Sequence, residues 1–277
     1  MKRILTVQDI SCIGKCSLTV ALPIISSMGV EVAALPTAVL STHTQFKDFT
    51  YRDLTSDLLD IKEHWKKEGF GFEAIYTGYL GSYEQIDILE TFFKDLKTEN
   101  NFIFIDPVMG DNGKLYTGFS QEFATRMKEL CSKADIIVPN LTEVSYMLQT
   151  EYKEKYSEEE IKELLIKLSA LGPKRVVITG VSFKENELGV MSYNKETHEF
   201  FKYFKEKIDV KYHGTGDIFA STLLGALVNE LSLEEALKVA TDYVWECIKV
   251  TYDEKKENAY GVEFEKVLPK LLMNSEE

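Results

Sequence analysis

The chain has 277 residues, of which 44% are hydrophobic and 12% aromatic, and its formal net charge is −13 at pH 7. This composition predicts a globular protein with a substantial core and excludes global disorder. The negative charge disfavours nonspecific binding to nucleic acid and docking on anionic lipid, so we expect a small-molecule partner, no nucleic acid and no membrane. An anionic substrate must then be held by local groups, such as helix N-termini or a metal ion.

Strand-like and helix-like runs alternate along the chain, which is typical of βαβ units. The predicted strands are 4–7, 31–35, 74–77, 102–105, 136–138 and 175–179, and the predicted helices between them are 17–28, 54–67, 82–97, 121–132 and 158–171. Two extended segments, 187–193 and 198–204, predict a hairpin turning through 194–195, and the last elements are helices over 218–228 and 233–251 and an amphipathic tail over 264–272. The pattern predicts an α/β fold with a mainly parallel central sheet flanked by helices.

Two further features concern domains and location. No stretch rich in Pro, Gly or Ser divides the chain, so we expect residues 1–277 to form a single domain. A strand begins at Ile4 without room for a signal peptide, no apolar run is long enough to cross a bilayer, and the four cysteines lack paired spacing. We therefore expect a cytoplasmic protein with reduced thiols.

The most informative motif is the run 213–217, His-Gly-Thr-Gly-Asp, directly before the apolar helix. Gly214 and Gly216 bracket Thr215 where that helix is expected to begin, so several backbone N–H groups can converge on an anion. The carboxylate of Asp217 projects beside them and can take a proton from a hydroxyl group. The motif predicts phosphoryl transfer to an alcohol. The alternative is a glycine-rich turn in which Asp217 is an ordinary first-turn carboxylate.

Polar residues and glycines follow most of the predicted strands, at the edge where open α/β sheets bind ligands. They are Gln8 and Asp9 after the first strand and the segments 78–82, 106–111, 139–143 and 179–180 after the third to the sixth. Four of them supply hard oxygen atoms suited to Mg²⁺ beside a nucleotide phosphate: Asp106, Asp111, Asn140 and Glu143. Alternatively, Asp106 begins a turn and Thr142 caps a helix. A Walker-type phosphate loop is absent, since Gly14 and Lys15 are only a fragment of one.

Together these segments resemble the pyridoxal kinase family of the ribokinase-like superfamily. The matching segments are Ser-Thr-His-Thr-Gln-Phe at 41–46, Gly-Tyr-Leu-Gly-Ser at 78–82, Asp-Pro-Val-Met-Gly-Asp at 106–111, Pro-Asn-Leu-Thr-Glu at 139–143 and Gly-Thr-Gly-Asp at 214–217. The resemblance implies a ribokinase-like three-layer sandwich. It also implies transfer of the γ-phosphoryl group of ATP to the 5′-hydroxymethyl group of pyridoxal, pyridoxine or pyridoxamine.

The resemblance further implies roles for individual residues. Asp217 resembles the catalytic base, and the backbone of Gly214, Thr215 and Gly216 resembles the anion hole. The nucleotide contacts are expected at Asp111, Asn140, Glu143 and Thr179, the metal ligands at Asp106 and Glu143, and the substrate contacts at Asp9, His43, Thr44 and Tyr79. Mg²⁺ with ATP is implied as the cofactor, closure of the loop 111–118 is expected to exclude water, and a K⁺ ion and a homodimer are implied as in many relatives.

The chain departs from the family pattern at two places. Asp9 stands where vitamin B6 kinases often have Ser, so it can meet the pyridine nitrogen or ring hydroxyl with a charge. His213, with Tyr212 before it, stands where relatives carry small or apolar residues, and it either contacts phosphate or is a partly exposed loop histidine. His43 likewise has either a packing role or a substrate contact. The rival functions are a hydroxymethylpyrimidine kinase, a sugar kinase and a noncatalytic ligand sensor.

Overall fold

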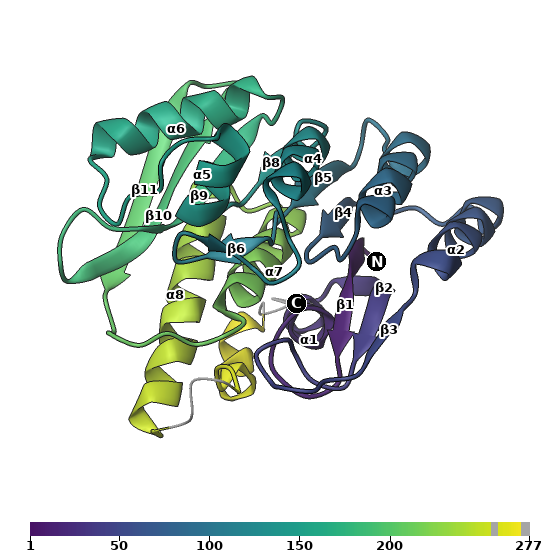
Figure 1. The fold of residues 1–277 in the computed structure, drawn as a ribbon, viewed down its shortest axis with the longest axis horizontal. Helices are drawn as coiled ribbons and strands as arrows, with labels where there is room; N and C mark the ends of the chain where they lie inside the picture. Colours follow the sequence, from purple (N-terminus) through teal and green to yellow (C-terminus); the bar gives the residue numbers. More distant parts are fainter. Residues whose placement is uncertain (256–259, 273–277) are drawn as a thin grey trace, which may run out of the picture. The chain divides into compact units, whose positions relative to one another are not determined.

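The computed structural model of the chain describes residues 1–255 and 260–272. Its internal contacts divide the chain into two compact units, which we call the terminal unit (1–74 and 208–277) and the middle unit (75–207). Both are α/β, and their mainly parallel strands are flanked by helices, as the sequence predicts (Figure 1). That the whole chain is one domain stays a prediction.

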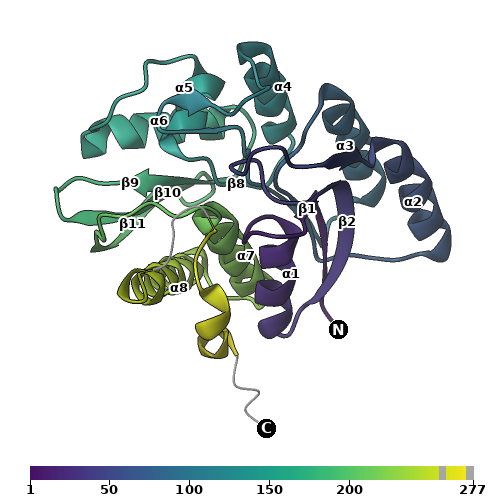
Figure 2. The ribbon, with the colours of Figure 1, turned by 60° about the horizontal axis from the view of Figure 1, so that its bottom comes forward.

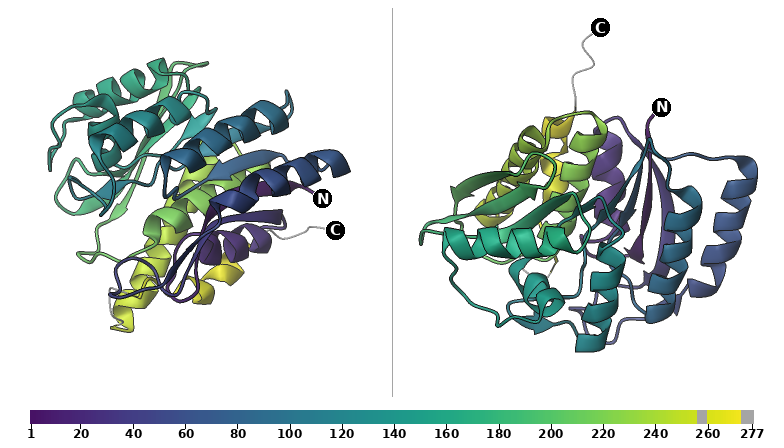
Figure 3. Two further views of the ribbon diagram at one scale, coloured as in Figure 1. Left: turned by 45° about the vertical axis from the view of Figure 1, so that its right-hand side comes forward. Right: turned by 90° about the horizontal axis from the view of Figure 1, so that it is seen from above.

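The terminal unit carries the first three strands and the last two long helices. Its elements are β1 (Arg3–Ser11), α1 (Leu18–Ser27), β2 (Glu31–Leu40), β3 (Tyr51–Asp53), α2 (Thr55–Glu68), α7 (Thr215–Val228), α8 (Leu233–Asp253) and the 3-10 turns η1 (Phe264–Lys266) and η2 (Leu268–Leu271). β2 is parallel to β1 and antiparallel to β3. α1 and α2 contact β2 from opposite faces (Figure 2), and α7 packs between α1 and α8 (Figure 3). α7 is buried from residue 218 to 228, as expected of a helix that is apolar on all sides.

The middle unit begins within β4 and alternates strands with helices. Its elements are β4 (Ala74–Thr77), α3 (Tyr83–Leu96), β5 (Phe102–Ile105), β6 (Gly110–Asp111), β7 (Lys114–Leu115), α4 (Gln121–Cys131), β8 (Ile136–Ile137), α5 (Leu141–Leu148), α6 (Glu158–Ala170), β9 (Arg175–Val181), β10 (Glu187–Asn194) and β11 (Glu199–Glu206). β5, β8 and β9 are parallel, and β10 and β11 form the expected antiparallel hairpin. The helices α3 to α6 pack in sequence order as neighbours.

One correction to the predicted elements concerns Asp9. Gln8 and Asp9 do not follow the first strand but lie inside it, because β1 and its partner β2 both run further than their hydrophobic pattern predicted. The pairing register shifts at this point, since Gln8 lies opposite Pro36 while Ile10 lies opposite Val39. Pro36 has no N–H group to continue the ladder, and a β-bulge of this kind redirects a side chain. The extra residue lies on β2, where Thr37 and Ala38 stand opposite Asp9 alone.

Other corrections concern short elements. The cap of α5 is Asn140 and not Thr142, because the Asn140 side chain accepts the backbone N–H groups of Thr142 and Glu143. The β10–β11 hairpin turns through 195–198, since Asn194 still pairs with Glu199. β3, β6 and β7 are too short to produce a periodic pattern and were not predicted. Within the described ranges, no helix has both the length and the apolarity needed to span a bilayer.

Candidate active site

The run 213–217 forms the start of α7. Gly214 is its N-terminal flanking residue, with a left-handed φ of 79°, and the helix begins at Thr215, so Asp217 is the third residue of the first turn. No side chain in the described part of the chain caps this helix. The first-turn N–H groups are therefore left to bind an anion at the positive end of the helix dipole. This helix start has the geometry expected of the predicted phosphate cradle, and its binding of phosphate stays a prediction.

The two glycines of the cradle differ in their surroundings. A Cβ atom on Gly214 would lie 1.8 Å from the carbonyl oxygen of Lys15, whereas a Cβ atom on Gly216 would meet nothing within 4 Å. Gly214 is thus required by the close approach of the loop before α1 and by its positive φ. Gly216 instead borders open space, where an anion can approach the backbone N–H groups.

The carboxyl group of Asp217 has the properties of a general base. Burial raises its pKa to about 7, the neighbouring Asp9 charge acts in the same direction, and a hydrogen bond from the backbone N–H of Ser17 acts against them. A base with a pKa near the working pH transfers protons most effectively. The raised pKa of Asp217 therefore suits its carboxylate to accepting a hydroxyl proton.

Asp9 lies close to Asp217 and is engaged with two serines. It is only 5% exposed, and its carboxylate oxygens accept hydrogen bonds from the hydroxyls of Ser17 (2.6 Å) and Ser11 (3.1 Å). Burial raises the pKa of Asp9, and the two serine hydroxyls lower it. The structure thus joins Asp9 to the loop that carries Ser17. Neither serine was singled out from the sequence.

The predicted substrate contacts His43 and Thr44 lie in the loop between β2 and β3. The His43 ring is buried, and its Nδ1 accepts the backbone N–H of Gln45. It contacts the His213 ring in a tilted arrangement, with 4.2 Å between the ring centroids. Burial, together with the nearby His43, lowers the pKa of His213 to about 4, so His213 is neutral at pH 7 and offers phosphate no positive charge. The side chain of Thr44 is exposed.

In the middle unit, the predicted metal and nucleotide residues come together around the start of α5. Glu143 accepts the backbone N–H groups of Asn140 (2.8 Å) and Met109 (3.2 Å), which completes a capping box with Asn140. Thr179 lies beside Asn140 in a parallel bridge. Asp111 is exposed, and its carboxylate accepts hydrogen bonds from the backbone and side-chain amides of Asn112. Its charge is near enough to help raise the pKa of Glu143. The ends of β5, β8 and β9 thus gather these residues, as the sequence predicts.

The Asp106 and Glu143 carboxyl groups fit a divalent cation. Both side chains are buried, and burial together with the Asp106 charge raises the pKa of Glu143 well above its usual range. Two neighbouring buried carboxylates repel each other, and a cation between them would relieve that repulsion. No cluster of three or more His, Cys, Asp or Glu residues suited to a metal occurs in residues 1–255 and 260–272. Mg²⁺ needs no larger protein cluster, because it is commonly held by one or two carboxylates plus substrate phosphates.

The remaining predicted substrate residue, Tyr79, belongs to an aromatic group in the middle unit. Its half-buried ring lies 5.6 Å from that of Phe119, which stacks on Phe123 with centroids 4.2 Å apart. These flat apolar surfaces are of the kind that holds a planar heteroaromatic ring. The four predicted substrate residues are therefore divided, with Tyr79 in the middle unit and the other three in the terminal unit.

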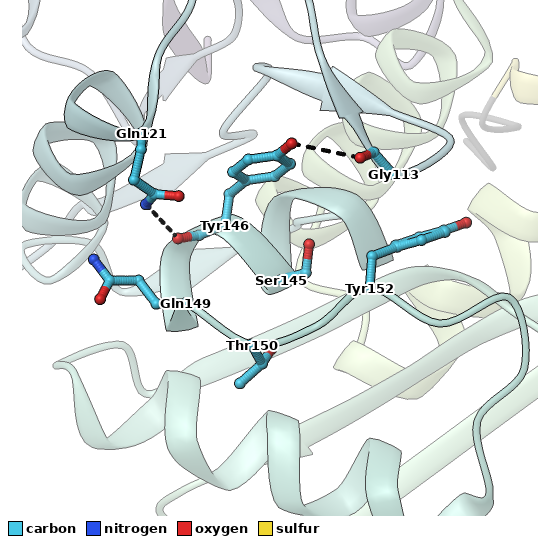
Figure 4. Close-up of a pocket in the computed structure, with 7 residues that line it drawn as sticks. All are labelled: Gly113, Gln121, Ser145, Tyr146, Gln149, Thr150 and Tyr152. Carbon is cyan, nitrogen blue, oxygen red and sulfur yellow. Dashed lines mark hydrogen bonds between the residues drawn. The ribbon is translucent and has the colours of Figure 1, made fainter.

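A cavity of about 500 Å³ in the middle unit contains none of the predicted site residues (Figure 4). The Tyr146 hydroxyl donates across it to the carbonyl of Gly113, and the Gln121 side chain donates to the carbonyl of Tyr146. Gly113 is also tied to α5, since its N–H donates to the Thr142 hydroxyl. The cavity lies between the β6–β7 hairpin and α5, and neither Asp106 nor Glu143 lines it.

Comparison with known proteins identifies the family. Residues 22–261 match the family model described as phosphomethylpyrimidine kinase. The chain belongs to this family. Pyridoxal kinase of Arabidopsis thaliana is 30% identical over 267 residues, which span 93% of this chain and 85% of that protein. The predicted resemblance to pyridoxal kinases is thereby confirmed.

Two further relatives extend the comparison. A Bacteroides thetaiotaomicron protein assigned as a phosphomethylpyrimidine kinase, crystallised with pyridoxal, is 44% identical, with a TM-score of 0.94 over 100% of this chain and 97% of that one. The hydroxymethylpyrimidine/phosphomethylpyrimidine kinase of Aquifex aeolicus is 29% identical over 226 residues, or 80% of this chain and 84% of that protein. The three-layer α/β fold is confirmed, and both kinase activities occur among the relatives.

Proposed function

We propose that the protein transfers the γ-phosphoryl group of ATP to the 5′-hydroxymethyl group of a vitamin B6 vitamer: pyridoxal, pyridoxine or pyridoxamine. The observation that carries the proposal is the position of Asp217, a carboxyl group with a pKa near 7 in the first turn of an uncapped helix. A base is useful there because an alcohol must lose its proton as a phosphoryl group arrives. The pyridoxal kinase relative and the relative crystallised with pyridoxal support this choice of alcohol.

The residues of the chain divide the work of the reaction. Asp217 takes the proton of the hydroxymethyl group, and the backbone N–H groups of Gly214, Thr215 and Gly216 donate hydrogen bonds to the oxygens of the transferring group. His43, Thr44 and Tyr79 hold the ring of the vitamer.

Mg²⁺ and ATP complete the proposal. Asp106 and Glu143 would hold Mg²⁺, which when bound neutralises charge on the phosphates. Asp111, Asn140 and Thr179 would contact the nucleotide. A K⁺ ion and a homodimer are proposed by analogy with relatives. A cytoplasmic location is proposed as well, and the four free cysteines favour it.

A hydroxymethylpyrimidine kinase is the second candidate, favoured by the name of the matching family and by the Aquifex aeolicus relative. Its substrate is also a planar heteroaromatic ring with a primary alcohol. Values of kcat/KM for the three B6 vitamers and for hydroxymethylpyrimidine, measured with the same enzyme preparation, separate the two. We expect a B6 vitamer to be preferred. A higher kcat/KM for hydroxymethylpyrimidine would replace the proposal with the second candidate.

The activity should depend on pH through Asp217. Because the pKa of Asp217 is raised to about 7, the carboxylate form of the base increases as pH rises through 7 and is lost below it. We therefore expect kcat/KM for pyridoxal to fall about tenfold for each pH unit below that pKa. The profile should be measured between pH 5 and 9 at saturating Mg²⁺ and ATP. A profile that is flat from pH 5 to 7 would exclude Asp217 as the base.

Glu143→Gln should weaken the use of Mg²⁺. The neutral amide loses the charge that faces a cation and keeps one of its two acceptor oxygens, so the Mg²⁺ concentration for half-maximal rate should rise about tenfold or more. The matched control is Glu160→Gln, which alters the capping box of α6 in the same way at an exposed position. We expect the control to keep the wild-type Mg²⁺ dependence. An unchanged Mg²⁺ requirement in Glu143→Gln would remove Glu143 from the metal site.

A further inference from the structure

Ser17 adopts a backbone conformation that is unfavourable for a serine. Its φ is 50° and its ψ is −135°, in a region of backbone space occupied mainly by glycine. Such conformations persist only where surrounding contacts hold them, and they cluster at functional sites. Ser17 is also buried. Its carbonyl oxygen accepts hydrogen bonds from the backbone N–H groups of Val20 and Ala21 at the start of α1.

Two contacts of Ser17 connect Asp9 to Asp217. The Ser17 hydroxyl donates to Asp9 at 2.6 Å. The loop that carries Ser17 packs against the start of α7, where the Lys15 carbonyl approaches Gly214, and the Ser17 backbone N–H group lies near enough to the Asp217 carboxylate to lower its pKa. The direction of that N–H bond is set by the φ of Ser17, so the contact with Asp217 exists only while Ser17 keeps its unusual conformation. The hydroxyl contact with Asp9 is one of the interactions that keep it there.

The other features of Asp9 agree with this role. Both carboxylate oxygens already accept serine hydroxyls, one of them from Ser17 in the loop before α1, and the side chain is 5% exposed. The same loop is fixed at Lys15, whose ammonium group pairs with Glu263 (3.0 Å) and Glu265 (2.8 Å). Because the loop is fixed at Lys15, loss of the Asp9 carboxylate would change the conformation of Ser17 itself.

We propose that Asp9 is a positioning residue: it holds Ser17 in its unusual conformation and, through the Ser17 N–H group, fixes the Asp217 carboxylate for proton transfer. This inference rests on the proposed function, because it assigns Asp217 as the base. It differs from the role expected from the sequence, in which Asp9 meets the substrate ring.

Kinetics of four variants test the proposal. Asp9→Ala and Ser17→Ala should each lower kcat about 10²-fold, the size of effect seen when a reacting group is misplaced, with KM for pyridoxal within about twofold of wild type. Ser17→Gly should keep most of the activity, because glycine adopts the conformation without help. Asp9→Ala combined with Ser17→Gly should then be much more active than Asp9→Ala alone.

Ser11→Ala is the matched control, since it removes the other hydroxyl on Asp9 but leaves Ser17 in contact. The kcat of Ser11→Ala should stay within about threefold of the wild-type value, because Ser11 takes no part in the contacts that link Asp9, Ser17 and Asp217. The proposal is overturned if Asp9→Ala raises KM at unchanged kcat, which is the behaviour of a substrate contact, or if Ser17→Gly fails to rescue Asp9→Ala.

A second readout does not depend on turnover. The pKa of Asp217, followed by NMR of its carboxyl carbon, should be higher in Ser17→Ala than in wild type, because the backbone N–H group of residue 17 is no longer held beside the carboxylate, and it should be unchanged in Ser11→Ala. Asp9 and Cys16 are titratable groups close to Asp217, and the thiol stays neutral because burial raises its pKa. An unchanged Asp217 pKa in Ser17→Ala would refute the positioning role even if no B6 vitamer is phosphorylated.

Discussion

Asp217→Asn is expected to lower kcat for pyridoxal phosphorylation by about 10² to 10⁴-fold, the range that a positioned general base contributes. The amide keeps the shape of the side chain and can still accept the Ser17 N–H, so the fold should be retained. Since Asp217 acts on the alcohol and not on the nucleotide, the Kd for ATP should change little. Steady-state kinetics at saturating ATP and pyridoxal give kcat, and calorimetry gives the Kd.

The control for this variant is Asp60→Asn, which neutralises an exposed carboxylate on α2 of the same unit. It should retain wild-type kcat and Tm. A near-normal kcat in Asp217→Asn would remove the base from the proposed mechanism. A large loss of Tm would show instead that Asp217 serves the stability of α7.

Gly214→Ala should have the second large effect, on stability as well as on rate. The new methyl group would meet the Lys15 carbonyl at 1.8 Å, and the φ of 79° is unfavourable for alanine. Strain of this kind costs about 3 kcal/mol, because backbone atoms on both sides must move. The measurement is urea unfolding together with kcat, and we expect both to fall.

Gly216→Ala separates the two roles of the cradle. Its methyl group would enter open space, so the free energy of unfolding should stay near the wild-type value. The same methyl group would stand where an anion approaches, and kcat/KM for ATP should fall about tenfold or more, as after loss of an oxyanion contact. Equal stability losses at Gly214 and Gly216 would contradict the distinction drawn from their surroundings.

Much of the fold follows from residue patterns. The amphipathic helix α3 and the apolar strands β5 and β9 have strong periodicity, and their predicted bounds agree closely with the structure. The residues around α5 were predicted because they follow strands, and parallel strands bring their carboxyl ends to one edge. For the same reason the gathering of Asp106, Asn140 and Glu143 could be anticipated.

The parts that were missed depend on contacts between distant segments. The β-bulge at Asp9 needs the register of β1 against β2, which residue patterns do not specify. The contact between the His43 and His213 rings joins two loops far apart in the sequence. Ser17 carried one available signal, a hydroxyl residue at a predicted helix start, but its glycine-like conformation and its bond to Asp217 appear only in three dimensions.

The central claim is that this chain phosphorylates the hydroxymethyl group of vitamin B6 with Asp217 as the base. ³¹P NMR of a reaction containing the protein, Mg²⁺, ATP and pyridoxal tests it directly. We predict that the γ-phosphate signal is replaced by ADP and an equal amount of a phosphomonoester coupled to the 5′-methylene protons, at a rate reduced at least 10²-fold by Asp217→Asn. ATP that stays intact, or ADP formed with inorganic phosphate and no ester, would contradict the claim.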